Sequence, residues 1–312
     1  MTVHGNGSAV VQSSSSLSSG QIKQEHCGCK GIRYCKLCAD SERVTNLSNM
    51  ENAKKYSDYQ YYIYNGENCV KSTDLASTST LQDVQLAYSS VLNESYDKKD
   101  LLIIDGLTLI PNFLSEEEEQ RLITRIDADK WNVSQSGRRK QDFGPRVNFK
   151  QKKIKLDSFY GMPDYTDFLL HRMLQNPALI DYQPFELCNL EYSENRASSI
   201  DFHQDDSWIW GNRLISVNLV SPSVMTLQNE QTKVLIFIYM PRRSLLCMAN
   251  EARYKYNHGI FAQHITGRRI GLTMREPSEH FQEGGELFEK YGKELIMLGN
   301  LFIVIIYLQK YQ

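Results

Sequence analysis

The chain reads Phe202-His-Gln-Asp-Asp206 within a run of short apolar segments. In an extended strand, side chains two residues apart point to the same face, so His203 and Asp205 are expected to lie side by side. Two histidines and one carboxylate on one face of an octahedron bind non-haem iron and leave three positions open for other ligands. His258 fits the third ligand, and His264 is the alternative. A histidine taken alone is more often a packed or surface imidazole.

A second polar pattern lies in Arg269-Ile-Gly-Leu-Thr-Met-Arg275. If this stretch is a strand, its polar and apolar side chains lie on opposite faces. The polar face then carries Arg269, Gly271, Thr273 and Arg275. Arginine binds carboxylates through planar, bidentate hydrogen bonds, so this face predicts a cavity that receives a dicarboxylate. The alternative is an amphipathic edge strand with solvated arginines.

The segments around these motifs predict an α+β fold. Ser115 and Glu118 can cap the start of one helix reciprocally, and Pro163 opens a second helix that runs to about Leu174. From residue 185 onward, short apolar segments alternate with turns. The predicted strands cover residues 185–190, 200–205, 214–220, 234–239, 244–248 and 269–274. Two helices that lead into several strands indicate a β-sandwich or barrel core.

The N-terminal third has a different organisation. Residues 59–64 and 68–71 predict a β-hairpin, because Asn65-Gly66 supplies the positive φ angles of a tight turn. Residues 72–99 are polar and weakly patterned, and we interpret them as a linker. The predicted divisions are a disordered Ser-rich tail (1–22), a cysteine cluster (23–40), the hairpin and linker (41–100), a main domain (101–285) and an apolar C-terminal extension (286–312).

Four cysteines crowd into one short stretch, Cys27, Cys29, Cys35 and Cys38. Four thiolates suit tetrahedral zinc, and short loops between ligand pairs are typical of such sites. His26 could replace one ligand, and free or redox-active thiols are the alternative. The stretch has too few apolar residues to fold by itself, so zinc is predicted to order it as a small knuckle.

Residues 138–155 form a basic stretch. It contains Arg138, Arg139, Lys140, Arg146, Lys150, Lys152, Lys153 and Lys155, opposed only by Asp142. Such a segment is either a solvated face or a surface that grips an acidic partner. Phe143 and Phe149 are the aromatic residues available for stacking on a nucleic acid. An acidic protein surface would be bound equally well.

Composition sets broad limits on the kind of protein. The 312 residues include 41% hydrophobic and 23% charged residues, with a formal net charge of −2. This near-neutral total predicts no general affinity for nucleic acid or membrane. Residues 295–308 are apolar but too few for a membrane span, which needs about 20 residues. Without a targeting signal, the cytoplasm and nucleus are the expected locations.

The motifs keep the order and approximate spacing of a known family, and the chain resembles the AlkB family of dioxygenases. The segments that carry the resemblance are Cys27-Gly-Cys-Lys-Gly-Ile-Arg33, Ser134-Gln-Ser-Gly-Arg-Arg-Lys-Gln-Asp142, Asn189-Leu-Glu-Tyr192, His203-Gln-Asp-Asp206, Pro241-Arg-Arg-Ser-Leu-Leu246, Tyr256-Asn-His-Gly-Ile260 and Arg269 to Arg275. The resemblance implies a double-stranded β-helix, or jelly roll, with iron held by His203, Asp205 and His258. It also implies that Arg269 binds the distal carboxylate of 2-oxoglutarate. Arg275, Tyr192 and Asn189 are implied to lie near this cosubstrate.

The resemblance also implies the chemistry. With Fe(II), 2-oxoglutarate and O2, such an enzyme removes N-methyl groups and releases formaldehyde, succinate and CO2. The implied substrates are methyl-lysine in a protein and N6-methyladenine in DNA, and the near-neutral total charge favours methyl-lysine as the primary one. A different hypothesis is a binding module that docks partners through the cysteine cluster and the basic stretch, with weak or no catalysis. An intact ligand set and arginine pair argue against this module, because a scaffold has no need of them.

Overall fold

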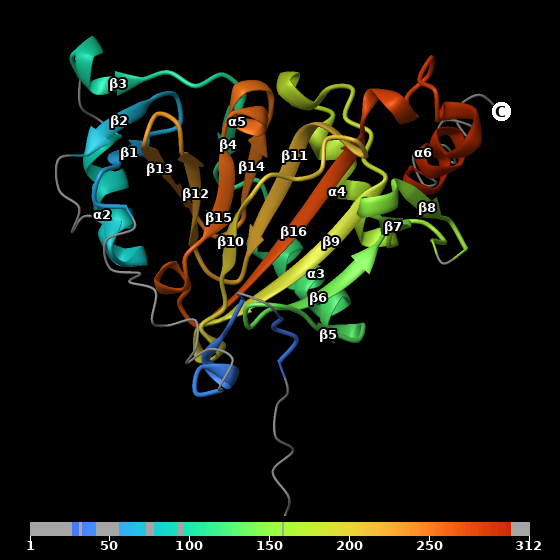
Figure 1. Ribbon diagram of the computed structural model, residues 1–312, viewed down its shortest axis with the longest axis horizontal. Helices are drawn as coiled ribbons and strands as arrows, with labels where there is room; N and C mark the ends of the chain where they lie inside the picture. Colours follow the sequence, from blue (N-terminus) through green and yellow to red (C-terminus); the bar gives the residue numbers. More distant parts are fainter. Residues whose placement is uncertain are drawn as a thin grey trace, which may run out of the picture.

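The chain folds into a sandwich of two seven-stranded β-sheets with helices on the outer faces (Figure 1). The computed structural model describes residues 27–30, 33–41, 56–72, 78–92, 96–157 and 159–300. One apolar cluster lies between the sheets and draws residues from both, and two more join the sheets to the helices outside them. The predicted α+β fold with a β-sandwich core is confirmed.

The first sheet has the strand order β10-β15-β12-β13-β1-β2-β3. Its strands are β10 (Ile200–His203), β15 (Asn257–Ile260), β12 (Ser223–Asn229), β13 (Val234–Met240), β1 (Gln60–Tyr64), β2 (Cys69–Ser72) and β3 (Leu101–Leu102). Strand β1 pairs in parallel with β13, whereas β1 and β2 form the predicted antiparallel hairpin. Gly66 in its loop has a φ of +105°, which a glycine adopts without strain. The hairpin therefore extends the sheet.

The second sheet has the strand order β4-β14-β11-β16-β9-β6-β5. Its strands are β4 (Leu107–Ile110), β14 (Ser244–Met248), β11 (Trp210–Leu219), β16 (Arg268–Pro277), β9 (Glu186–Ser193), β6 (Arg139–Phe143) and β5 (Asn132–Val133). A small separate hairpin follows β6 and consists of β7 (Arg146–Asn148) and β8 (Lys153–Lys155).

Strands β9 to β16 wind between the two sheets. Strands β9, β11, β14 and β16 lie in the second sheet, and β10, β12, β13 and β15 lie in the first. Their spatial orders are β14-β11-β16-β9 and β10-β15-β12-β13. This alternation is that of a jelly roll, in which each strand crosses to the facing sheet or to its neighbour. Residues far apart in the chain therefore meet between the sheets.

Helices α3 (Glu116–Ala128) and α4 (Asp167–Met173) cover the outer face of the second sheet. At the start of α3, Ser115 and Glu118 accept hydrogen bonds from each other's backbone N–H groups, as predicted. A 3-10 turn, η5 (Asp164–Thr166), precedes α4 after Pro163. The other short helical elements are η1 (Lys36–Cys38), η3 (Lys98–Asp100), η4 (Phe149–Gln151), η6 (Pro177–Leu179), η7 (Glu194–Arg196), α5 (Asn250–Tyr254), η8 (Ala262–His264) and η9 (Glu279–Phe281).

The linker prediction for residues 72–99 was wrong in part, because helix α2 (Leu81–Val91) lies within them. Thr80 and Asp83 cap its start reciprocally. Its buried residues Leu81, Val84 and Val91 pack on the outer face of the first sheet, in the cluster that contains Phe237. These apolar positions are few and widely spaced, so the sequence gives only a weak helical signal. The helix is stabilised mainly by packing on the sheet.

The described part of the C-terminal extension packs on the core. A π-helical turn, η10 (Phe288–Gly292), leads into α6 (Lys293–Gly299), whose Leu295 is fully buried. Residues 301–312 and the Ser-rich tail lie outside the described residues. Within the part that the structure describes, no helix is both long enough and apolar enough to cross a membrane.

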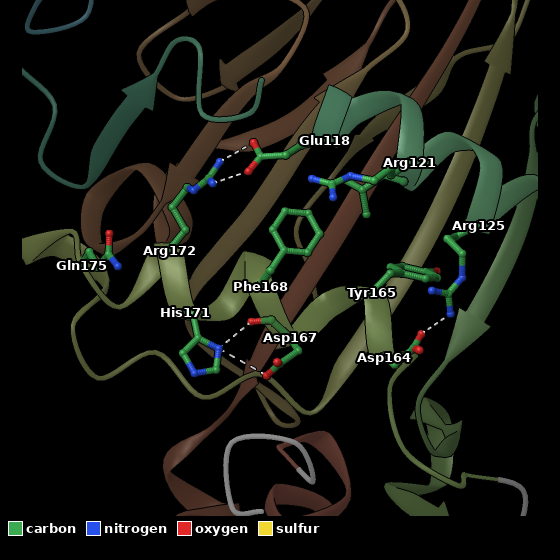
Figure 2. A pocket seen from close by; sticks show the side chains of 11 residues that line it. Glu118, Arg121, Arg125, Asp164, Tyr165, Asp167, Phe168, His171, Arg172 and Gln175 are labelled. Carbon is green, nitrogen blue, oxygen red and sulfur yellow. Dashed lines mark hydrogen bonds and ion pairs between the residues drawn. The ribbon is translucent and has the colours of Figure 1, made fainter. Parts of the chain in front are cut away.

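Ion pairs tie α3 to α4 across a groove of about 630 Å³ (Figure 2). Glu118 accepts hydrogen bonds from both terminal nitrogens of Arg172, at 2.8 and 2.5 Å. Arg125 pairs with Asp164 at 2.5 Å, and His171 lies 3.3 Å from Asp167. The groove lies outside the second sheet, so that sheet separates it from the interior of the sandwich. Two of its carboxylates, Glu118 and Asp164, are already paired with arginines of the protein, so these ion pairs do not indicate a ligand.

The Glu118–Arg172 pair predicts a pH-dependent stability. Hydrogen bonds from Arg172 lower the pKa of Glu118 to about 2, against about 4.3 in an unfolded chain. A lowered folded-state pKa contributes stability above pH of about 4.3, and this contribution is lost as the pH falls towards 2. Glu118→Gln should therefore lower the free energy of unfolding by about 1–3 kcal/mol at pH 7. The deficit should shrink below pH of about 4 in urea titrations.

A suitable control is Glu283→Gln, which removes an exposed carboxylate in the loop after η9. This change should leave the free energy of unfolding within about 0.5 kcal/mol of the unmodified protein. A Glu118→Gln deficit of the same size at every pH would contradict the assigned role of the ion pair.

Candidate metal and cosubstrate site

The two predicted histidine ligands face each other across neighbouring strands. Strands β10 and β15 are antiparallel, and His203 stands directly opposite His258. Their ring centroids lie 4.3 Å apart. His258 also pairs with Leu227, which belongs to the cluster between the sheets, so its side chain points inward. Asp205 follows β10, and one ligand atom of each of the three residues lies within 4.8 Å of the other two. The structure therefore brings the predicted set together.

Both imidazoles can offer a lone pair to a metal. Nδ1 of His203 lies 2.8 Å from the carbonyl oxygen of Asp201. A carbonyl only accepts, so this nitrogen carries the hydrogen and Nε2 keeps its lone pair. Burial lowers the pKa of His258 to about 3, and the adjacent His203 adds to this effect. The ring of His258 is therefore neutral at neutral pH.

Asp205 is held as a carboxylate in a buried position. Burial alone would raise its pKa, but Arg275 and the two histidines outweigh this effect and hold the pKa well below its usual value. Nε of Arg275 donates to Oδ2 at 2.8 Å, and Nη2 of Arg253 donates to the backbone carbonyl of Asp205 at 2.9 Å. The three side chains thus form a donor set of two imidazole nitrogens and one anionic oxygen, which suits non-haem iron.

His264, the alternative third ligand, lies elsewhere. It is fully buried, and its Nε2 is 2.9 Å from the carbonyl oxygen of Thr78. Its ring packs against Phe237 and Phe261. His264 is therefore a packed core histidine, and His258 completes the set.

Strand β16 points its polar residues into the sandwich, as predicted. Arg269 stands opposite Tyr192 of β9, and its guanidinium lies 4.8 Å from the centroid of that ring. Its Nε donates to Oδ1 of Asn218 on β11 at 2.7 Å. The apolar residues Ile270, Leu272 and Met274 alternate with the polar residues on β16. They pack outward against buried side chains of α3 and α4.

Arg269 has no carboxylate partner in the described part of the chain. It is 2% exposed, and its Nη2 makes no hydrogen bond there. A buried charge without a partner is strongly destabilising, so the position requires an anion. Gly271 leaves room beside the guanidinium, because a Cβ atom there would stand 2.7 Å from Nη1. The pairing of an iron donor set with a buried, unpaired guanidinium fits Fe(II) and a dicarboxylate cosubstrate.

Arg275 differs from Arg269 because the protein already pairs it. Besides Asp205, it contacts Glu186 at 3.5 Å, and its guanidinium lies 4.5 Å from the ring centroid of Trp210. It therefore orients a candidate ligand. Of the residues expected near the cosubstrate, Tyr192 lies beside Arg269 and Arg275 lies beside Asp205.

The expectation for Asn189 was wrong. Its Nδ2 donates to Gln141 and to the hydroxyl of Tyr165, which lies in the helix layer outside the second sheet. The physical reason is the two-residue period of a strand: Asn189 and Tyr192 are three apart, so they lie on opposite faces of β9. Asn218, which our reading of the sequence missed, supplies the amide beside Arg269. The available signal was an asparagine inside the mostly apolar run of residues 214–220.

The four clustered cysteines also converge. Cys27, Cys29, Cys35 and Cys38 each offer a sulfur atom, and these atoms lie within 4.8 Å of one another. The backbone N–H of Gly28 donates to the carbonyl of Ser134 at 3.2 Å. The cluster thus packs against the turn between β5 and β6.

Comparisons with known proteins agree with this geometry. No family model matches the chain. A protein of Caenorhabditis elegans named "DNA N6-methyl adenine demethylase" is 53% identical over 89% of this chain and 96% of its own length. "Alpha-ketoglutarate-dependent dioxygenase alkB homolog 4" of mouse is 34% identical over 89% of this chain and 95% of its own length. The human protein of the same name is 34% identical over 88% and 94%. At this identity and coverage, the chain belongs to the AlkB family of Fe(II)/2-oxoglutarate-dependent dioxygenases.

Proposed function

We propose that this enzyme removes the methyl group of N6-methyladenine in DNA. The main evidence for catalysis is the buried guanidinium of Arg269, which has no anionic partner among the described residues. It lies between the same two sheets as His203, Asp205 and His258. A scaffold has no use for an uncompensated buried charge, whereas a dicarboxylate cosubstrate would neutralise it. This contrast favours catalysis over a pure binding module.

Each residue of the site then has a definite task. His203, Asp205 and His258 would hold Fe(II), and Arg269 would bind the far carboxylate of 2-oxoglutarate. When bound with O2, this pair supplies the oxidation that releases an N-methyl group as formaldehyde, with succinate and CO2 as co-products. Arg275 keeps Asp205 ionised and oriented, and the carbonyl of Asp201 keeps Nε2 of His203 available.

The basic stretch supports DNA as the substrate, because the structure divides it into two parts. Arg138 is buried, Arg139 pairs with Glu191, and Lys140 pairs with Asp142. The remaining five cations lie exposed on the hairpin β7–β8 and form no ion pair within the described residues. These are Arg146, Lys150, Lys152, Lys153 and Lys155. We name this group the basic hairpin; its free cations suit a phosphate backbone.

The basic hairpin is joined to the candidate site by a chain of contacts. Phe149 at its tip is 44% exposed, and its ring centroid lies 5.3 Å from that of Trp210. Trp210 in turn packs on Arg275, which binds Asp205. A nucleic acid on the hairpin would therefore be held close to the metal site, with an exposed aromatic ring available for stacking on a base.

This distribution of charge favours N6-methyladenine in DNA over methyl-lysine in a protein as the substrate. The near-neutral total charge favoured methyl-lysine, but the total conceals a local concentration of unpaired cations on the basic hairpin. The 53% identical relative also carries a name that specifies N6-methyladenine in DNA. We propose nuclear and cytoplasmic locations, the nuclear one following from the substrate. The cysteine cluster belongs to the proposal as a structural zinc site.

The metal assignment predicts the effect of two histidine substitutions. His258→Ala should weaken Fe(II) binding by more than about 100-fold, because it removes one of three ligands. His264→Gln should leave the affinity within about twofold, because His264 lies outside the set. Anaerobic Fe(II) titration would measure both. Equal losses in the two variants would mean that His258 acts only through the fold.

The cosubstrate assignment predicts the effect of Arg269→Ala. Succinate formation should fall to background at 2-oxoglutarate concentrations that saturate the unmodified enzyme, while Fe(II) affinity stays within about twofold. Arg269→Lys should recover part of the activity, since an ammonium group cannot donate the same two parallel hydrogen bonds.

Arg268→Ala is the matched control for Arg269→Ala. Arg268 is adjacent on β16 but points outward to Asp127 and Glu191. Its replacement should leave the KM for 2-oxoglutarate unchanged. An Arg269→Ala enzyme with an unchanged KM would refute the role of Arg269.

The substrate proposal predicts the effect of reversing two charges on the basic hairpin. Lys152→Glu with Lys153→Glu should weaken binding of unmethylated oligonucleotides of any sequence and lower the slope of log affinity against log salt by about two. Lys98→Glu with Lys99→Glu makes the same change in charge beside β3 and should have little effect. The contrary outcome is that both double variants bind DNA alike, while only the variant at Lys152 and Lys153 has a raised KM for a methyl-lysine protein. That outcome would indicate a protein substrate in place of DNA.

A further inference from the structure

The segment that carries the cysteine cluster is poorly held by apolar packing. Cys35 is 1% exposed, but Tyr34 and Leu37 are 48% and 42% exposed, so their side chains contribute little buried surface. The segment is nevertheless compact, with the sulfurs of Cys35 and Cys38 4.0 Å apart. Sulfurs around a tetrahedral zinc lie roughly 3.8 Å apart. A bound cation would supply the cross-link that the apolar residues do not.

Backbone amides point at the sulfurs, as expected around thiolate ligands. The N–H of Cys35 donates to Sγ of Cys38 at 3.3 Å. The N–H of Ser136, from the turn between β5 and β6, donates to Sγ of Cys29 at 3.1 Å. Hydrogen bonds to ligating sulfur orient the ligand and stabilise its negative charge. The second of these bonds also connects the cluster to the jelly roll.

The turn that receives this contact has a constrained backbone. Ser136 and Gly137 have φ of +51° and +71°. A Cβ atom at Gly137 would stand 2.5 Å from the carbonyl oxygen of Arg196 and 3.2 Å from Cβ of Cys35. The turn is therefore enclosed between the cysteine cluster and the segment that contains Arg196. Such a conformation persists only where the surroundings hold it.

Arg138 follows this turn and extends towards Tyr192, whose ring also lies beside Arg269. It is 9% exposed, and its Nε donates to the carbonyl of Gln135 at 3.2 Å. Its guanidinium lies 5.9 Å from the centroid of the Tyr192 ring, the same ring that Arg269 contacts at 4.8 Å. Arg138 forms no ion pair in the described part of the chain. Two buried guanidiniums thus converge on one ring where the protein supplies no carboxylate.

We infer that the cysteine cluster is a zinc site that positions Arg138 as a second cationic contact for the distal carboxylate of 2-oxoglutarate. The path runs from Cys29 through the N–H of Ser136 to Arg138 and Tyr192. This inference rests on the proposed function of Arg269. It adds Arg138 as a second cosubstrate-binding residue and the zinc site as the feature that positions Arg138. Because Arg196 and Ser198 hold the other side of the turn, zinc loss should weaken cosubstrate binding rather than abolish it.

The test measures zinc content and 2-oxoglutarate affinity separately. Protein purified under reducing conditions without chelator should contain about one zinc per chain. Affinity would be titrated anaerobically with Mn(II) in the iron site, so that no turnover is needed. Cys35→Ser with Cys38→Ser should lose the zinc and raise the Kd for 2-oxoglutarate about tenfold. Chelation of the unmodified protein followed by zinc addition should reproduce and then reverse the change.

Arg138→Ala separates the coupling from general damage to the fold. It should raise the Kd by about the same factor while the zinc remains, and Arg138→Lys should recover part of the affinity. Adding Arg138→Ala to the double cysteine variant should cause little further loss, because both act through one contact. Cys247→Ala is the matched control: this buried cysteine lies in the helix-facing cluster outside the sandwich, so zinc and Kd should stay unchanged.

Any one of four outcomes would overturn the inference. Fresh, reduced protein without zinc would remove the metal site. If the protein lost zinc without a change in the Kd for 2-oxoglutarate, the zinc site would not be coupled to cosubstrate binding. An unchanged Kd in Arg138→Ala would lead to the same conclusion. An unmodified protein that binds no 2-oxoglutarate would refute the proposed function and the coupling with it, while the zinc measurement would still decide the nature of the cluster.

Discussion

The ion pair between Arg275 and Asp205 joins the two sheets where the candidate ligands meet. Arg275 extends from β16 in the second sheet, and Asp205 follows β10 in the first. The side chain of Asp205 is buried and that of Arg275 is only 12% exposed, and a buried charge is tolerated only with a well-aligned partner. The pair therefore constrains the distance between the sheets, the ionisation of Asp205 and its orientation towards His203 and His258. Arg253 adds to this constraint through the backbone of Asp205.

The two arginines on the inner face of β16 have opposite electrostatic situations. Arg275 meets a carboxylate of the protein, whereas Arg269 meets only the neutral amide of Asn218 and the ring of Tyr192. One positive charge is thus compensated by the fold, and the other is left for a ligand. The metal donors therefore lie near the Arg275 end of β16. The guanidinium without a carboxylate partner lies at the Arg269 end of the same strand.

The basic stretch shows how one segment can contribute to two different surfaces. Its first residues enter or border the second sheet, where Arg139 pairs with Glu191 and Arg138 turns towards Tyr192. Its later residues form the basic hairpin, where the cations remain exposed. The summed charge of the stretch does not show which cations are paired and which are exposed. Whether a cation forms an ion pair depends on the carboxylates that the neighbouring strands supply. The part that faces solvent is the part available to a polyanion.

The sequence by itself determined those features whose cause is a local period or cap. These include the common face of the polar residues from Arg269 to Arg275, the pairing of His203 with Asp205, the Asn65-Gly66 hairpin and the reciprocal cap that starts α3. Only the tertiary structure decided that Asn189 faces the helix layer, that Asn218 supports Arg269 and that α2 forms. The physical reason is that a period records which side chains share a face. Which face is inside, and what lies opposite, depends on strands that are distant in the chain and meet only on folding.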